Sequence, residues 1–278
     1  MIKSAKVDKI LKSVEQLKPL PGSISRVLQA TDDPQTNSSI LSEIIGLDQA
    51  LSAKVLQMAN SASLGYGPGC STLSDAVMRL GFKRIRTIVL GIGASSPLTK
   101  RLSGYRLGAG QLWTHSVSAS TAAQWIARHM SYPEPEEAYV AGLLHDIGKL
   151  LLDQFILVDY QQIMYSVRIQ KKMLCEAEEE LIGINHAKVG SLMAEKWNFP
   201  TVLVEAIKYH HTPSLAFEGP ILAAIVNVSN AFASENTKDL DPKGMIVHPE
   251  SYQILNLEER TLEKLKTEMD QYFKLTSS

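Results

Sequence analysis

Histidines, together with one aspartate, are the residues of this sequence whose types and spacing could support chemistry. The chain holds seven histidines, and all but His248 fall between residues 115 and 211. A lone histidine on a helix is usually a packed or surface residue, and we interpret His129 and His248 in that way. The others form a candidate ligand set with the aspartate: His115, His145, Asp146, His186, His210 and His211. Neutral imidazole and carboxylate are common ligands of divalent transition metals, so the set predicts a metal site.

His145 and Asp146 are adjacent in the segment Leu143-Leu-His-Asp-Ile-Gly-Lys149. Adjacent residues on a regular helix point about 100° apart, so the helix must end or distort there if both are to face one metal. Gly148 would supply that freedom. The corresponding chemistry is metal-assisted hydrolysis of a phosphoester, in which bound ions polarise a phosphoryl oxygen and activate a water. In such an enzyme Asp146 would bridge two ions and Lys149 would offset phosphate charge, which makes these two the candidate catalytic residues.

Helical periodicity dominates the elements that must position these side chains. Apolar residues recur at helical spacing along most of the chain, and no segment alternates convincingly at the period of a strand. Helices are predicted at 8–17, 22–31, 38–45, 51–59, 72–80, 82–94, 111–129, 136–152, 155–171, 174–182, 186–197, 201–211, 220–234 and 257–273. The acidic residues from Glu176 to Glu180 are expected at the surface. The sequence therefore predicts an all-α fold.

A polar, glycine-rich stretch at residues 95–110 marks the predicted domain boundary. We expect an N-terminal helical subdomain over 1–105 and a helical domain with the histidines over 106–235. A C-terminal loop and helix would then occupy 236–278.

The composition gives little reason to expect a nucleic-acid partner. Net charge is −1, and 21% of the residues are charged, so neither nucleic acid nor an anionic membrane is favoured electrostatically. A short basic cluster at Lys83, Arg84 and Arg86 is the one feature that could support nucleic-acid binding. We prefer to interpret this cluster as a solvated helix face.

Cysteine usage and the apolar runs indicate the compartment. Cys70 and Cys175 are far apart and lack Cys-x-x-Cys spacing, which argues against a disulfide framework or a thiolate zinc site. No signal peptide and no transmembrane run are recognisable. We therefore expect a cytoplasmic protein.

The histidine motifs resemble those of the HD superfamily of metal-dependent phosphohydrolases, and their order is similar to its branch that cleaves cyclic di-GMP. These motifs are His115, His145-Asp-Ile-Gly-Lys149, His186-Ala-Lys-Val-Gly190 and His210-His211. Residues from about 15 to 215 resemble more closely the HDOD family, the HD-related output domains of bacterial signalling. The motifs that carry this second resemblance are Leu20-Pro-Gly-Ser-Ile24, Leu51-Ser-Ala-Lys-Val-Leu-Gln-Met-Ala-Asn-Ser-Ala62, Leu73-Ser-Asp-Ala-Val-Met-Arg-Leu-Gly81 and Leu112-Trp-Thr-His-Ser116.

The resemblance implies an N-terminal helical bundle packed against an HD-like helical domain, and a regulatory role without catalysis. An HD hydrolase closes its metal site with an aspartate on a later helix. The candidate positions here hold Asn227 and Asn230, which are neutral amides. Loss of a carboxylate weakens the attraction for a divalent ion. The Gly-Tyr-Pro signature of the cyclic di-GMP branch is also absent after His211, so the resemblance implies a degenerate site.

We therefore expect a bacterial signal-transduction module that binds a signalling protein or a small ligand rather than turning over a substrate. The alternative is a metal-dependent phosphohydrolase acting on a nucleotide or a phosphodiester, supported by the retained histidines. The cofactor would be a divalent metal (Fe, Mn, Zn, Mg or Ni), and a metal-free module is left open.

Overall fold

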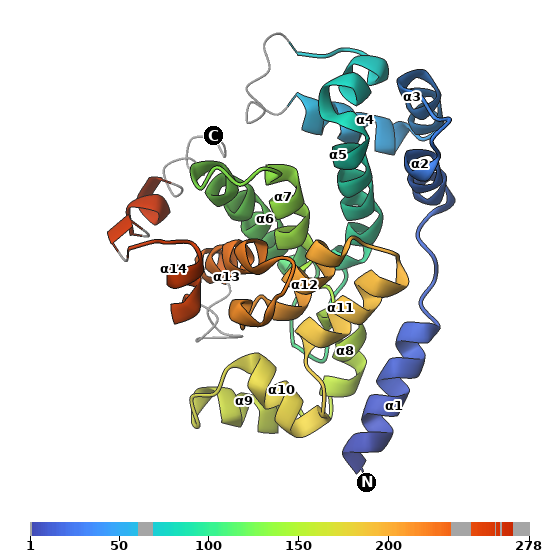
Figure 1. The fold of residues 1–278 in the computed structure, drawn as a ribbon. Helices are drawn as coiled ribbons and strands as arrows, with labels where there is room; N and C mark the ends of the chain where they lie inside the picture. Colours follow the sequence, from blue (N-terminus) through green and yellow to red (C-terminus); the bar gives the residue numbers. More distant parts are fainter. Residues whose placement is uncertain (1, 61–68, 235–245, 259, 262, 269–278) are drawn as a thin grey trace. The chain divides into compact units, whose positions relative to one another are not determined.

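The computed structural model describes residues 2–60, 69–234, 246–258, 260–261 and 263–268. Among these residues no strand forms, and the one isolated β-bridge joins Leu102 to Leu107. The all-α prediction is therefore confirmed (Figure 1). The helices are α1 (Ile2–Glu15), α2 (Gly22–Asp32), α3 (Ser38–Gly46), α4 (Gln49–Ala59), α5 (Leu73–Ser95), η2 (Ser96–Thr99), α6 (Gln111–His129), α7 (Pro135–Leu144), α8 (Lys149–Ile156), α9 (Tyr160–Arg168), α10 (Leu174–Ile182), α11 (His186–Lys196), α12 (Thr201–Tyr209), η3 (Pro213–Leu215), α13 (Pro220–Ser234) and α14 (Pro249–Ile254).

Two compact units make up the chain. One comprises residues 18–96, and the other comprises residues 1–17 together with 97–278. This division differs from the boundary expected near residue 105, because α1 contacts α8, α10 and α11 and so joins the unit that carries the histidines.

The unit of residues 18–96 is built around α5, which contacts α2, α3 and α4. Helix α5 covers both of the helices predicted at 72–80 and 82–94, with a break at Gly81, whose φ is 73°. Arg86 joins α5 to α2 by an ion pair of 2.7 Å with Asp32 and a hydrogen bond to the Leu28 carbonyl. One member of the predicted basic cluster is thus used inside this unit.

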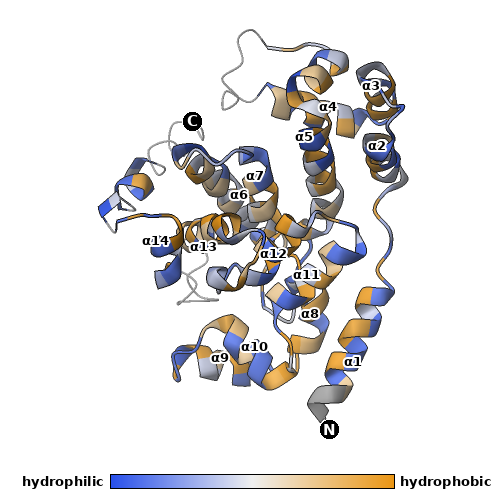
Figure 2. Cartoon of the chain, in the orientation of Figure 1, coloured by the Kyte–Doolittle hydropathy of each residue, from blue (hydrophilic) through white to orange (hydrophobic). Residues whose placement is uncertain are grey.

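Helix α13 lies at the centre of the other unit. Every residue from Leu222 to Ser234 is buried, as expected for a helix that is apolar around most of its circumference. It contacts α6, α7, α12 and α14, and Figure 2 colours it largely as hydrophobic. A helix held on all sides is a rigid support for the side chains that project from it and from its neighbours.

Helices α6 and α7 pack unusually closely, because small residues line their contact. A Cβ added at Gly142 of α7 would lie 2.8 Å from the carbonyl oxygen of Ala119 and 3.0 Å from the Cβ of Ala123 on α6. Real Cβ atoms essentially never approach a neighbour within 3.0 Å. The close approach brings the end of α7 next to the first turns of α6, where His115 lies.

The C-terminal part differs from its prediction. Helix α14 begins at the end of the stretch predicted to be a loop, residues 235–250, and continues beyond it to Ile254; Pro249 starts the helix and His248 caps it. Of the helix predicted at 257–273, residues 260–261 and 263–268 are helical, residues 257–258 are not, and the rest lie outside the described residues. None of the described helices combines the length and the apolar character that a membrane span requires.

Candidate metal centre

The turn between α7 and α8 carries the central pair of the site. Helix α7 ends at Leu144 and α8 begins at Lys149, so His145 and Asp146 lie in a break between two helices. This break is the distortion that the sequence predicts, and it lets two adjacent side chains face the same point.

Gly148 has a different role from the one predicted. Its φ of −62° is an ordinary helical value, so no unusual backbone angle is needed. A Cβ at this position, however, would lie 1.9 Å from the carbonyl oxygen of His186 and 2.5 Å from the backbone nitrogen of Gly190. Gly148 therefore permits the close approach of α11, which brings His186 to the pair at the turn.

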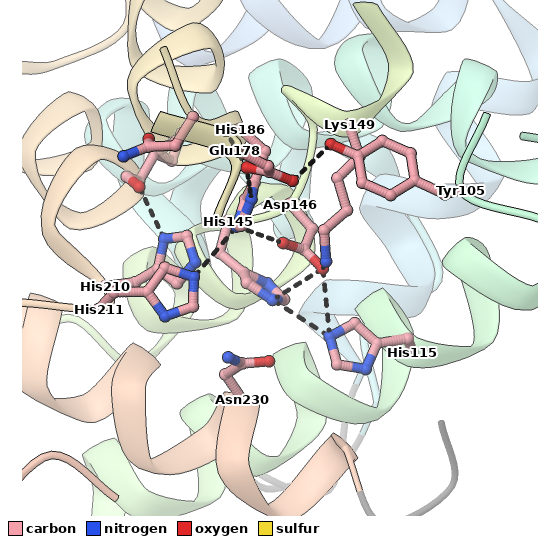
Figure 3. Close-up of polar contacts among 12 residues, drawn as sticks. Tyr105, His115, His145, Asp146, Lys149, Glu178, His186, His210, His211 and Asn230 are labelled. Atoms are coloured by element: carbon pink, nitrogen blue, oxygen red, sulfur yellow. Dashed lines mark hydrogen bonds and ion pairs between the residues drawn. The ribbon is translucent and has the colours of Figure 1, made fainter. Parts of the chain in front are cut away.

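The candidate ligands come from four separate places in the chain and converge (Figure 3). His115 lies on α6, His186 is the first residue of α11, and His210 and His211 directly follow the end of α12. The exposed fraction of these residues and of the central pair runs from 0 to 6%. The structure thus brings together every residue of the predicted ligand set.

Three of the ligands form a first cluster, made of His115, His145 and Asp146. The Nε2 atoms of the two histidines are 3.2 Å apart. Asp146 Oδ2 lies 3.4 Å from the Nε2 of His115 and 3.5 Å from that of His145. Ligand atoms bound tetrahedrally about 2.1 Å from one ion lie about 3.4 Å from each other, so the spacing fits a single ion.

The second cluster consists of His186, His210 and His211. The Nε2 atoms of His186 and His211 are 3.0 Å apart. The other carboxylate oxygen of Asp146, Oδ1, lies 3.3 Å from the Nε2 of His186. Asp146 therefore presents one oxygen to each cluster, which is the arrangement of a carboxylate between two neighbouring cation positions.

Hydrogen bonds fix which ring nitrogens face the centre. Nδ1 of His145 donates to the Gly142 carbonyl at 2.8 Å, and Nδ1 of His210 donates to the Ile207 carbonyl at 2.7 Å. Because a carbonyl only accepts, Nε2 of each neutral ring carries a lone pair. Nε2 of His210 is buried and has no hydrogen-bond partner among the described residues. A bound cation would satisfy this nitrogen, so the residues present fit a divalent metal.

His186 is oriented by a carboxylate behind it. Glu178 Oε2 accepts from the backbone N–H of His186 at 2.8 Å and from its Nδ1 at 2.7 Å. Glu178 Oε1 accepts from the hydroxyl of Tyr105 at 2.8 Å. Metal-bound histidines commonly donate their second nitrogen to such a carboxylate, which holds the ring and raises its basicity.

The expectation that the acidic residues 176–180 lie at the surface is wrong for Glu178, which is fully buried. The residue falls on the buried stripe of α10, together with Leu174, Cys175 and Ile182. Its spacing from these apolar residues could have indicated from the sequence that Glu178 is buried. Tyr105 carried no such signal, because it lies in the polar stretch at 95–110.

Charges within the site set the protonation states that ligation requires. Burial lowers the pKa of His115 to about 3, and Asp146 offsets this only in part. Burial also takes the pKa values of His210 and His211 well below their ordinary value. Burial alone would raise the pKa of Asp146, but Lys149 and the neighbouring histidines hold it well below its usual range. His115, His210 and His211 are therefore neutral and the carboxylate is ionised, as metal binding requires.

Lys149 contacts the carboxylate directly. Its Nζ lies 2.6 Å from Asp146 Oδ2, and its exposed fraction is 8%. In this structure the ammonium thus neutralises the charge of the central carboxylate.

The two asparagines of α13 have different places. Asn230 lies beside His115 (Figure 3), and its proximity acts to raise the pKa of that histidine. Asn227 donates from Nδ2 to the His210 carbonyl at 2.8 Å, and its Oδ1 accepts from the backbone N–H of His248 and the hydroxyl of Ser251. Asn227 is therefore engaged in structural hydrogen bonds, and Asn230 alone of the two remains at the edge of the ligand cluster.

A family model and several known proteins match this chain in sequence or in fold. The family model of the HDOD domain matches residues 17–213. The chain belongs to the HDOD family. Its fold is also that of solved HDOD relatives: an HDOD domain protein from Geobacter sulfurreducens is 23% identical, with a TM-score of 0.62 over 96% of each chain. A candidate phosphohydrolase from Shewanella amazonensis is 25% identical, with a TM-score of 0.66 over 94% of this chain and 93% of that one.

Curated relatives of this HDOD chain are longer. A protein from Treponema pallidum is 24% identical over 82% of this chain, which corresponds to 43% of that protein. Ribonuclease Y of Lactobacillus gasseri is 27% identical over 55% of this chain and 24% of that enzyme. The chain therefore spans less than half the length of the curated relatives that it matches.

Proposed function

We propose that this HDOD chain is a regulatory module of bacterial signalling whose buried imidazole cluster binds a divalent metal without turning over a substrate. Its output would be the binding of a signalling protein or a small ligand. The observation that carries the proposal is the composition of the centre. Its inward-facing donors are imidazoles with a single carboxylate, Asp146, and that carboxylate is already paired with Lys149.

The case for metal binding rests on lone pairs. Nε2 of His145 and Nε2 of His210 carry no proton, because Nδ1 of each ring donates to a carbonyl, and Nε2 of His210 has no partner among the described residues. Burying an unsatisfied polar atom costs about 1–3 kcal/mol. A divalent ion held by His186, His210, His211 and Asp146 would remove this cost. Glu178 would keep His186 in the orientation that such an ion needs.

The case against turnover rests on charge. Asn230 stands at the edge of the His115 cluster, where a carboxylate would have added a negative charge. Lys149 neutralises the one carboxylate that remains among the clustered ligands. Two divalent ions together with an ammonium would leave a large uncompensated positive charge in a buried site. The centre is thus better suited to hold an ion firmly than to assemble a two-metal hydrolase.

The alternative function is a metal-dependent phosphohydrolase acting on a nucleotide or a phosphodiester. Two observations favour it: the convergence of the complete predicted ligand set, and the likeness to the Shewanella amazonensis protein described as a candidate phosphohydrolase. Bound metal would supply polarisation of a phosphoryl oxygen and an activated water. Lys149 would then have to leave Asp146 in order to face a phosphate.

The test compares metal content with turnover. Protein purified without chelators is analysed for Fe, Mn, Zn, Mg and Ni, and is then assayed on cyclic and linear phosphodiesters with added Mn²⁺, Fe²⁺ or Mg²⁺. We expect bound metal that is lost in His186→Ala and His210→Ala, with no turnover above the metal-only blank. Turnover that disappears in both variants would establish the hydrolase instead. Protein that takes up no metal would refute the metal-binding proposal.

A further inference from the structure

The two ligand clusters differ in their nearest positive charge. Lys149 Nζ lies 2.6 Å from Asp146 Oδ2, the oxygen that faces His115 and His145. The opposite oxygen, Oδ1, faces His186. An ion bound to Oδ2 would therefore share that oxygen with the ammonium, whereas an ion bound to Oδ1 would not.

The position of Lys149 is fixed by the local fold. It is the first residue of α8, and its backbone N–H donates to the carbonyl oxygen of Asp146 at 3.0 Å. The side chain follows Asp146 by three residues on the same turn and is 8% exposed. If the ammonium moved away, the buried carboxylate would lose its charged partner, which is costly at a buried position.

The donor sets also differ in strength. The second cluster offers three imidazoles, and Nε2 of His210 among them has no hydrogen-bond partner in the described part of the chain. The first cluster offers two imidazoles and the oxygen already held by Lys149, and it has the neutral Asn230 beside it. An incoming cation therefore gains more and is repelled less in the second cluster.

We infer that the centre takes one divalent ion rather than two, held by His186, His210, His211 and Asp146 Oδ1, while the ammonium of Lys149 serves as the built-in cation of the other half. The inference rests on the proposed metal binding and specifies its stoichiometry and place. The positive charge that a second ion would bring is already supplied by the chain itself.

The stoichiometry is tested by titrating the chelator-treated full chain with Co²⁺, whose visible absorption reports bound ion and its coordination. We expect the wild-type titration to break at about one equivalent. Lys149→Met keeps the length of the side chain and removes its charge, and we expect its titration to break at about two equivalents. Lys149→Gln serves as the second variant if the methionine variant does not fold. Circular dichroism and urea unfolding check each protein.

The location is tested with matched histidine variants. His210→Ala is expected to lose the Co²⁺ absorption, while His115→Ala is expected to retain one ion. His129→Ala, outside both clusters, is the control for the loss of a histidine as such.

The outcomes distinguish the inference of a single ion from the proposed metal binding itself. Two ions in the wild-type chain, or one ion that survives in His210→Ala but not in His115→Ala, would overturn the inference and leave the proposed metal binding intact. No Co²⁺ binding in the folded wild-type chain would overturn both. One ion in the wild-type chain and two in Lys149→Met would support both.

Discussion

Glu178 Oε2 accepts two hydrogen bonds from His186, one from its backbone N–H at 2.8 Å and one from its Nδ1 at 2.7 Å. A single oxygen thus fixes both the start of α11 and the ring that projects from it. The carboxylate is fully buried, so this orientation is not weakened by competition from water.

Glu178→Gln is expected to weaken metal binding by roughly 10–100-fold, because the amide no longer provides a charged acceptor that orients His186 and raises its basicity. Isothermal titration with Zn²⁺ measures the change. Glu180→Gln is the matched control, since Glu180 lies on the same helix with its side chain 50% exposed. Equal affinities of the two variants would show that Glu178 does not act through His186.

Tyr105→Phe is expected to destabilise the fold by about 1–3 kcal/mol, because it leaves a buried carboxylate oxygen of Glu178 without its donor. Urea unfolding of the metal-free protein measures the free energy of unfolding. Tyr165→Phe removes the same hydroxyl from an exposed residue of α9 and should leave stability almost unchanged. A loss of similar size in both variants would contradict this interpretation.

Gly148→Ala is expected to reduce both stability and metal binding. The added Cβ would lie 1.9 Å from the His186 carbonyl oxygen, so α11 must move away from the turn at His145. Overpacking of this kind costs typically about 1–3 kcal/mol, and backbone contacts yield less readily than side chains. Gly22→Ala is the control, because nothing lies within 4 Å of a Cβ added there. Thermal unfolding and Zn²⁺ titration report the two effects separately.

The metal-free chain should lose stability as the pH falls. The pKa of His115 is lowered from 6.5 to about 3 in the folded chain. Below pH 6.5 the unfolded chain binds the extra proton and the folded chain does not, so the free energy of unfolding decreases as the pH falls through that window. From pH 6.5 to 5 the loss for His115 alone is about 2 kcal/mol. Burial lowers the pKa values of His145, His210 and His211 too, so they act in the same direction.

Urea unfolding at several pH values between about 7.5 and 5 measures this dependence. His115→Gln should reduce the slope of the free energy of unfolding against pH by up to one proton. His129→Gln, at a side chain that is 45% exposed, should leave this slope unchanged. A free energy of unfolding that stays constant over this range would contradict the neutral, buried state of the histidines.

Asn230→Asp is expected to strengthen metal binding at the His115 side, because a carboxylate there adds the charge that the site lacks. Asn227→Asp is the contrasting variant. It would lose the hydrogen bond from Nδ2 to the His210 carbonyl, so it should destabilise the chain without adding a ligand. Co²⁺ titration and urea unfolding of both variants distinguish these results. Improved metal binding by the Asn227 variant alone would show that Asn227, and not Asn230, lies at the metal-binding position.

The sequence could predict which side chains converge, because few residue types bind metals and the histidines fall in recognisable motifs. The break at His145 and Asp146 followed from the 100° rotation between neighbouring helical residues. The sequence could not separate Asn227 from Asn230, because their different contacts depend on how α13 meets the end of α12 and the start of α14. Glu178 was overlooked because a run of glutamates is ordinarily solvated, although its place on the apolar side of α10 indicated burial. Its hydrogen bonds with His186 and Tyr105 stabilise the buried carboxylate.

Asn227 also links distant parts of the chain. Its amide holds the carbonyl of His210 at one end and the first residues of α14 at the other, through His248 and Ser251. Because one side chain makes both sets of hydrogen bonds, displacement of α14 would be expected to loosen the backbone at His210. One amide group therefore joins the backbone of a candidate metal ligand to the start of a short helix that follows it by more than thirty residues.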